Sequence, residues 1–248
     1  MKVDDMMNHT IFPEKRGIVI ACDVTTIDLL EKLVTETSTI EGVVGYKIGS
    51  ILGLKYGLNA ITRIISRQSR LPIIYDHQKA GTDIPALAKK LVVTCKDADI
   101  SAMIIFPFAG PATLESFVDT ARDLGVSLIA GAAMTHQRFF ESEGGYLSSQ
   151  SIERMYDKAA SLGIAHFVVP ATRPTVLKQY LHLILRHCES PSFLLPGIGA
   201  QGGSISDTFK QLDNYNAYAI VGSAIYEAES IQKSARRFAT EAIANPLG

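Results

Sequence analysis

The chain has 248 residues, 47% of them hydrophobic and 20% charged, which is enough for one large core and a little short for two comfortable domains. Its formal net charge is -1 with scattered basic residues, which excludes the broad positive surface that binds nucleic acid or anionic lipid. No apolar stretch reaches the about 18 residues that a membrane span requires. We therefore expect a single domain that binds neither nucleic acid nor membrane.

The first ten residues and the cysteines bear on the compartment. The opening MKVDDMMNHT has acidic and amide residues where a signal peptide has a basic patch and an apolar run. The three cysteines, Cys22, Cys95 and Cys188, match no metal motif, and their odd number speaks against a disulfide framework. We expect free thiols, no metal site and a cytoplasmic location.

Short apolar runs rich in Val and Ile alternate with longer amphipathic stretches from residue 17 onward. Helices are expected between the runs, for example over 25–38, with Leu29, Leu30 and Leu33 on one apolar stripe, and over 208–215. The apolar runs cover 17–23, 43–48, 72–76, 102–106, 127–131, 166–170, 192–196 and 217–222. Eight βα repeats predict an α/β protein with one closed (β/α)8 TIM barrel. We assign 1–16 to an N-terminal extension, 17–226 to the barrel and 227–248 to a C-terminal helix packing on it.

An open dinucleotide-binding sheet is the alternative α/β fold. That fold has about six strands and a Gly-x-Gly-x-x-Gly turn after the first strand, whereas the first run here ends in Asp23-Val24-Thr25-Thr26. The barrel is favoured, and its active site is expected at the carboxyl ends of the strands. The polar residues at those ends are Asp23, Lys47, Asp76, Lys79, Thr135, Thr172, Arg173, Gln201 and Ser223.

The densest group of charges follows the third run, in IIYDHQKAGTDIP (73–85). Asp76, Lys79 and Asp83 lie within eight residues there, and Lys47 is available from the preceding strand end. Alternating carboxylates and ammonium groups hold one another in the charged state and keep the pKa of each lysine high. Such a lysine can donate a proton, although a solvated ion-pair patch is the other interpretation of this segment alone.

Several segments at separate strand ends carry a family resemblance. LPGIGAQGG is the most specific, because a Pro-Gly turn after the seventh strand exposes backbone N–H groups where barrels bind phosphate. The segments are CD (22–23), GYK (45–47), the D-K-D-I-P series of DHQKAGTDIP, MTH (134–136), ATRP (171–174), LPGIGAQGG (195–203) and IVGSAIY (220–226). Over roughly residues 17–226 the chain resembles the orotidine 5'-monophosphate decarboxylase family.

The resemblance implies decarboxylation of orotidine 5'-monophosphate (OMP) to UMP without a cofactor, in homodimers with shared active sites. Lys79 would protonate C6 of the pyrimidine, with Asp76 beside the departing carboxylate and Lys47 completing the charge network. A carbanion next to a fixed ammonium group is stabilised electrostatically. Asp83 with Ile84 would reach into the neighbouring subunit's site. The substrate-binding residues would be Asp23 at the ribose, Thr135 at the ring, and Arg173, Gly199, Gln201, Gly202, Gly222 and Ser223 around the phosphate.

Two features depart from the family pattern. The motif has one extra residue on each side of Lys79, so either a bulge at Gly81 absorbs them or His77 or Gln78 points into the site. Ser223 stands where the family usually has an arginine that grips the phosphate. That replacement removes a contact worth about 1.5 to 3 kcal/mol, unless Arg173, Arg138 or backbone N–H groups compensate.

Two other functions are compatible with parts of the pattern. 3-Keto-hexulose-phosphate synthase and related sugar-phosphate enzymes use a similar Asp-x-Lys-x-x-Asp frame, and some bind magnesium. A catalytically impaired homologue that binds a phosphorylated ligand is the second. The MTH and GIGAQGG segments favour the decarboxylase, and the retained charges argue against an abandoned site, because clustered charges are costly to keep.

Overall fold

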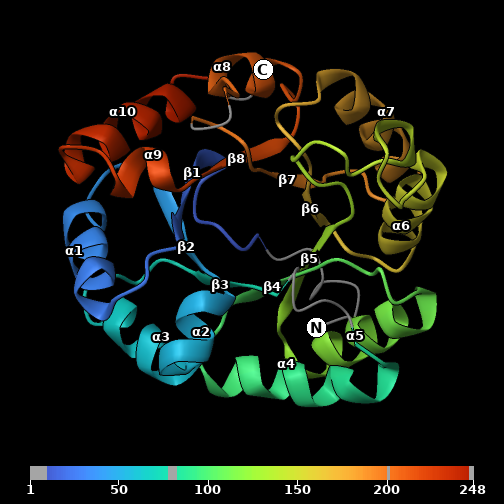
Figure 1. Ribbon diagram of the computed structural model, residues 1–248, viewed down its shortest axis with the longest axis horizontal. Coiled ribbons are helices and arrows are strands. Elements are labelled where there is room, and N and C mark those ends of the chain that lie inside the picture. Colours follow the sequence, from blue (N-terminus) through green and yellow to red (C-terminus); the bar gives the residue numbers. More distant parts are fainter. Residues whose placement is uncertain (1–9, 78–82, 200–201, 246–248) are drawn as a thin grey trace.

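The computed structural model describes residues 10–77, 83–199 and 202–245. Eight parallel strands form a closed barrel in which each strand pairs with the next and β8 pairs with β1 (Figure 1). The strands are β1 (Arg16–Cys22), β2 (Val43–Ile48), β3 (Ile73–Asp76), β4 (Ala102–Ile105), β5 (Ser127–Gly131), β6 (His166–Val168), β7 (Ser192–Leu195) and β8 (Asn216–Val221). The predicted (β/α)8 barrel is confirmed, and each strand lies within two residues of its expected bounds.

Helices surround the strands on the outside of the barrel (Figure 1). They are α1 (Ile27–Thr37), α2 (Ser50–Tyr56), α3 (Leu58–Ser66), α4 (Ala88–Asp97), α5 (Pro111–Leu124), α6 (Ser149–Ser161), α7 (Pro174–Ile184), α8 (Ile205–Lys210), α9 (Ser223–Tyr226) and α10 (Ile231–Ile243), with 3-10 turns η2 (Pro85–Leu87) and η3 (Glu141–Glu143). Within the described ranges, no helix has the length and apolar character needed to cross a membrane.

The helix starts follow from local chemistry. Thr26, Ser148, Ser204 and Ser230 precede α1, α6, α8 and α10, and each side-chain oxygen accepts a hydrogen bond from a backbone N–H of the first turn. Such caps satisfy donors that have no partner within the helix. α10 then packs against β1, α1, α8 and α9.

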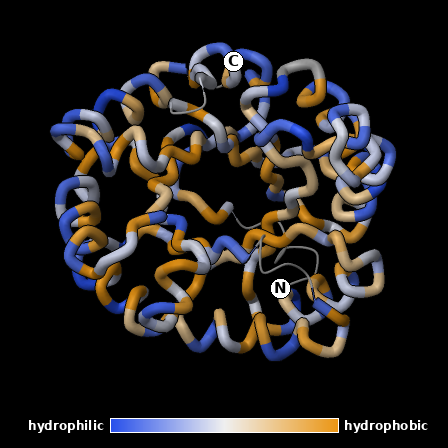
Figure 2. Tube along the Cα trace, in the orientation of Figure 1, coloured by the Kyte–Doolittle hydropathy of each residue, from blue (hydrophilic) through white to orange (hydrophobic). Residues whose placement is uncertain are grey.

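The hydrophobic core has two layers, because alternate residues of each strand face opposite sides of the sheet. Val19, Val44, Ile74 and their neighbours fill the barrel interior, while Ile18, Tyr46 and others pack between the strands and the helices. Figure 2 shows the hydrophobic colours concentrated on the strands.

One expectation for α1 is wrong. Leu30 and Leu33 are buried as expected, but Leu29 is 44% exposed. The buried stripe continues through Val34 and Thr37 instead, since positions three and four apart share a helix face.

The amino-terminal end of the barrel is closed by residues that precede or begin β1. Phe12 is buried, belongs to the interior cluster, and its ring centroid lies 4.1 Å from that of Tyr218 on β8. The buried guanidinium of Arg16 donates hydrogen bonds to the carbonyl oxygens of Phe209 and Leu212. These contacts seal one end, and the opening lies at the carboxyl ends of the strands.

Candidate active site

A cavity of about 380 Å³ opens at the carboxyl ends of the strands, a size that suits a small-molecule ligand. Its apolar lining includes Ile104, Val168 and Ile220 from three different strands or strand ends. Other lining residues, several of them polar, come from two sides. Asp23, Lys47, Ser50 and Asp76 follow or belong to β1, β2 and β3, and Pro196, Gly197, Ile198, Gly222, Ser223 and Tyr226 follow β7 and β8.

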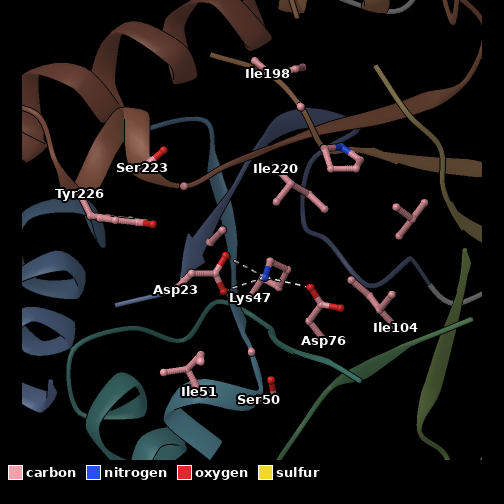
Figure 3. A pocket seen from close by; sticks show the side chains of 16 residues that line it. Asp23, Lys47, Ser50, Ile51, Asp76, Ile104, Ile198, Ile220, Ser223 and Tyr226 are labelled. Atoms are coloured by element: carbon pink, nitrogen blue, oxygen red, sulfur yellow. Dashed lines mark hydrogen bonds and ion pairs between the residues drawn. The ribbon is translucent and has the colours of Figure 1, made fainter. Parts of the chain in front are cut away.

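Three charged side chains meet on the first side. Lys47 Nζ lies 2.9 Å from Asp76 Oδ2 and 3.1 Å from Asp23 Oδ1 (Figure 3). Lys47 and Asp76 are buried, with 6% and 9% of their surface exposed, whereas the Asp23 side chain is 47% exposed. We call these three residues the charged triplet.

The strand register explains why the triplet forms. Ala21 of β1, Lys47 of β2 and Ile74 of β3 lie level with one another in adjacent strands. Asp23 and Asp76 are each two residues further along, so their side chains face the same side, one step closer to the opening. The long side chain of Lys47 therefore rises between two carboxylates.

The triplet keeps Lys47 positively charged. Burial alone would lower the pKa of Lys47, but the carboxylates of Asp76 and Asp23 more than offset that effect and raise its pKa above the ordinary value. The ammonium group is thus held from two sides, and the triplet carries a net charge of -1 when both carboxylates are ionised.

The rest of the strand-three motif lies partly outside the described residues, which include neither Lys79 nor Gln78 and Gly81. His77 is described and does not line the cavity. Its ring centroid is 5.3 Å from that of Tyr75, and its backbone N–H donates to Ile104 O at 3.1 Å. The β3–β4 hydrogen bonding therefore continues past Asp76 with His77 on the outward side, which disfavours the alternative in which His77 enters the site.

Asp83 and Ile84 lie outside the cavity and on the surface. The Asp83 carboxylate accepts the backbone N–H of Ile84 at 2.7 Å, and its carbonyl oxygen accepts the Thr113 hydroxyl at 2.9 Å. Ile84 is 60% exposed. Both residues are therefore anchored near the start of α5 and accessible from outside.

The glycine-rich segment after β7 makes a tight turn. Gly197, Gly199 and Gly202 have φ values of 93°, 82° and 81°, which favour glycine. The N–H groups of Gly199, Gly202 and Gly203 donate to carbonyl oxygens within the segment, and only Pro196, Gly197 and Ile198 of its described residues line the cavity. Gly199 and Gly202 shape the turn without lining the cavity, and Gln201 is outside the described residues.

Arg173 lies away from the cavity. Its guanidinium pairs with Glu143 at 2.5 Å, donates to His136 O at 3.1 Å, and sits 4.8 Å from the centre of the Phe140 ring. The hydrogen bond from Arg173 lowers the pKa of Glu143. Arg173 therefore ties the β5–α6 connection to the start of α7.

Thr135 and Arg138 lie on that same β5–α6 connection. Thr135 is half-buried and Arg138 is exposed, and neither lines the cavity. Gly222 and Ser223 do line it, as the sequence predicts for the strand-eight end.

Tyr226 and Ser50 are lining residues that the sequence reasoning did not select. Both lie on helices that begin directly after a strand, α9 and α2. The available signal for Tyr226 was the helix start at Ser223, because a residue three positions later lies on the same helix face.

Together, the fold and the site define a class of protein. A closed parallel barrel with a buried charged group and a ligand-sized cavity at the carboxyl ends of its strands is the architecture of a TIM-barrel enzyme. The glycine turn after β7 lies where such enzymes bind phosphate.

Comparison with known proteins specifies the family. The family model described as "Orotidine 5'-phosphate decarboxylase / HUMPS family" matches residues 16–238, and the chain belongs to this family. Orotidine 5'-phosphate decarboxylase of Methanococcus maripaludis is 32% identical over 89% of this chain and 94% of its own. The Methanocaldococcus jannaschii protein of that name is 31% identical over 89% and 96%.

A solved structure extends the comparison to three dimensions. The crystal structure of orotidine 5'-monophosphate decarboxylase from Methanocaldococcus jannaschii, complexed with the inhibitor BMP, matches with a TM-score of 0.79 and 26% identity. The match covers 91% of this chain and 98% of that one. The likeness thus extends over nearly the whole of both chains.

Proposed function

We propose that this protein decarboxylates OMP to UMP without a cofactor. The observation that carries the proposal is the charged triplet at the mouth of a barrel whose relatives are named orotidine 5'-phosphate decarboxylase. Decarboxylation that leaves a carbanion needs a fixed positive charge and a proton donor more than it needs an electron sink. Lys47 is such a fixed charge, and Lys79 follows the strand that supplies Asp76.

In the proposed reaction, the bond between C6 and the carboxylate carbon breaks and carbon dioxide leaves. The electron pair left at C6 takes a proton from Lys79, which becomes neutral and recovers its proton from water. Asp76 stands beside the departing carboxylate, so their repulsion is relieved as charge moves to C6. Lys47 pairs with Asp76 and holds its carboxylate in place, and Asp23 binds a ribose hydroxyl with its exposed oxygen.

We further propose that the enzyme is a homodimer in which Asp83 and Ile84 complete the partner's site. An exposed carboxylate beside a 60% exposed isoleucine at the open end of the barrel suits a contact with a second copy. Thr135 and the described glycines 199 and 202 would act only once a ligand and the residues around it close over the cavity.

The test is a direct assay of purified protein that follows the loss of OMP absorbance. Turnover should be unaffected by EDTA, and Lys79→Ala should abolish it while leaving the circular dichroism spectrum and melting temperature intact. Lys90→Ala, an exposed lysine of α4, is the matched control and should retain full activity. If Lys79→Ala keeps even about a tenth of wild-type turnover, a loss of about 1.4 kcal/mol or less, Lys79 is not the proton donor.

A further inference from the structure

The cavity lining has two parts of different character. One part is the charged triplet, and the other, formed by Gly197, Ile198, Gly222, Ser223 and Tyr226, has no charged side chain. Tyr226 lies where the two parts meet, close to Asp23 (Figure 3). Lys47 is the only cation among the cavity-lining residues that the structure describes. It already contacts two carboxylates, so its charge is paired within the triplet.

The two arginines that the sequence suggests as substitutes do not line the uncharged part. Arg173 is held by Glu143 and by the His136 carbonyl, and Arg138 is exposed on the β5–α6 connection. Neither contributes to the cavity wall. An anionic group bound beside α9 must therefore rely, among the described side chains, on neutral hydrogen-bond donors.

Two hydroxyl groups are placed to be those donors. Ser223 and Tyr226 are three residues apart on α9, on one face of the helix, and both side chains point into the cavity (Figure 3). Among the described parts of the chain, neither hydroxyl has a hydrogen-bond partner. A Cβ at Gly222 would lie 3.5 Å from Tyr226 Cε1, so the ring rests against the backbone at the end of β8, which limits its rotation.

The tyrosine is also in the right protonation state. Burial raises the pKa of Tyr226, and the nearby carboxylate of Asp23 raises it further. Its phenol therefore stays protonated at neutral pH and can donate a hydrogen bond.

We infer that Tyr226 and Ser223 form a hydroxyl pair that donates hydrogen bonds to the substrate's phosphate, in the place where the family usually has an arginine. Tyr226 is then a specificity-determining residue that distinguishes a nucleotide from its nucleoside. The inference rests on the proposed function for the identity of the substrate, but its test needs only binding of the product. A neutral hydrogen bond contributes less than a charge-assisted one, so the pair replaces one strong contact with two modest ones.

The test compares binding of UMP and uridine by titration calorimetry. Tyr226→Phe keeps the ring and removes the hydroxyl, so it should weaken UMP binding by about 3- to 10-fold, as expected for one neutral hydrogen bond. Uridine binding should not change. Adding Ser223→Ala should weaken UMP binding by about 10- to 100-fold in total, again without an effect on uridine. Tyr146→Phe, which removes a fully exposed phenol on the β5–α6 connection, is the matched control.

The outcomes separate this inference from the proposed function. Equal weakening of UMP and uridine would assign the hydroxyl to the ribose or base and overturn the inference, as would no change in either. Wild-type protein that binds UMP no better than uridine also overturns it. If wild-type protein fails to turn over OMP but shows the expected UMP-specific loss in Tyr226→Phe, the decarboxylase proposal fails and the hydroxyl pair stands.

Discussion

Lys47 is paired with two carboxylates at once, so its loss should affect the site more than the loss of a surface charge. Removing it leaves Asp76 buried without the cation 2.9 Å away. Removing one partner of a buried ion pair costs about 3 to 5 kcal/mol. We predict that Lys47→Ala lowers the free energy of unfolding by that amount, measured by urea denaturation at pH 7.

Two further variants make that measurement specific. Lys158→Ala removes a surface pair with Glu115, whose side chains are 39% and 45% exposed, and should cost less than about 1 kcal/mol. Adding Asp76→Asn to Lys47→Ala should restore part of the stability, because it removes the carboxylate charge that lost its contact with Lys47. A loss in Lys47→Ala no greater than that in Lys158→Ala would show that the triplet is not a coupled buried network.

The pH dependence of the Lys47 contribution follows from the direction of its shift. The pKa of Lys47 is raised in the folded protein, so its contribution is fully present below the ordinary lysine pKa of about 10.4. It is lost only as the pH rises through the higher folded value. The stability difference between wild type and Lys47→Ala should therefore stay constant from pH 7 to about 10.

The site residues differ in how well the sequence alone predicts that they line the cavity. Asp23, Lys47 and Asp76 could be predicted because each lies at the carboxyl end of an apolar strand. The carboxyl ends of all strands of a parallel barrel lie on the same side, where the active site forms. Tyr226 could not be predicted, since an aromatic residue one turn into a helix more often packs in the hydrophobic core than lines a binding site. Arg173 matches a family segment in sequence, but the ion pair that turns it away from the cavity depends on a glutamate 30 residues earlier.

Among the elements, the β5–α6 connection is tied to the start of α7 by one ion pair. Arg173 pairs with Glu143, and the Glu143 carboxylate also accepts the backbone N–H of Phe139. We predict that Glu143→Gln speeds hydrogen exchange of the backbone amides between Phe139 and Leu147, because the charge-assisted bonds are lost. Deuterium uptake by mass spectrometry at neutral pH measures this.

The control variant for the hydrogen-exchange measurement changes a glutamate on the same 3-10 turn. Glu141 is exposed, and its carboxylate has no ion pair in the described part of the chain, so Glu141→Gln should leave the exchange unchanged. Because the pKa of Glu143 is lowered, the Arg173–Glu143 pair is fully present above the ordinary glutamate pKa of about 4.3 and is lost as the pH falls through the lower folded value. Equal uptake in wild type and Glu143→Gln would mean that the Arg173–Glu143 pair does not hold the segment.

The strands were more predictable than the helices. A strand buried on both faces reads as a continuous apolar run, which marks its bounds within two residues. Short helices leave weaker signals: α2 and α3 follow one another across Gly57, and α9 has only four residues. Both α2 and α9 line the cavity, so the elements that shape the site are those that hydrophobic periodicity describes least well.

At the scale of the whole molecule, the proposed dimer makes a quantitative prediction. If Asp83 acts in the partner's site, a mixed dimer of Asp83→Asn and Lys79→Ala has one site with both defects and one with neither. Equal mixing with subunit exchange makes half of the dimers mixed, so about a quarter of the sites, and of the wild-type activity, should return. The measurement is OMP turnover before and after exchange.

Each inactive parent carried through the same exchange alone is the control. Mass spectrometry of the intact assemblies shows that mixed dimers have formed. Activity that stays at the parental level despite mixed dimers would place Asp83 in the site of its own subunit.

The seam between β1 and β8 has a consequence for how the chain is made. The two strands pair over five positions from Arg16–Ala217 to Ile20–Val221, and Arg16 reaches carbonyl groups 193 and 196 residues away. During synthesis, β1 and β7 therefore each keep one unpaired edge until β8 has left the ribosome. Open strand edges and uncovered apolar surface are where nascent chains associate wrongly. The barrel can therefore close only after Asn216–Val221 has emerged, and until then the earlier strands are open to wrong association with other chains.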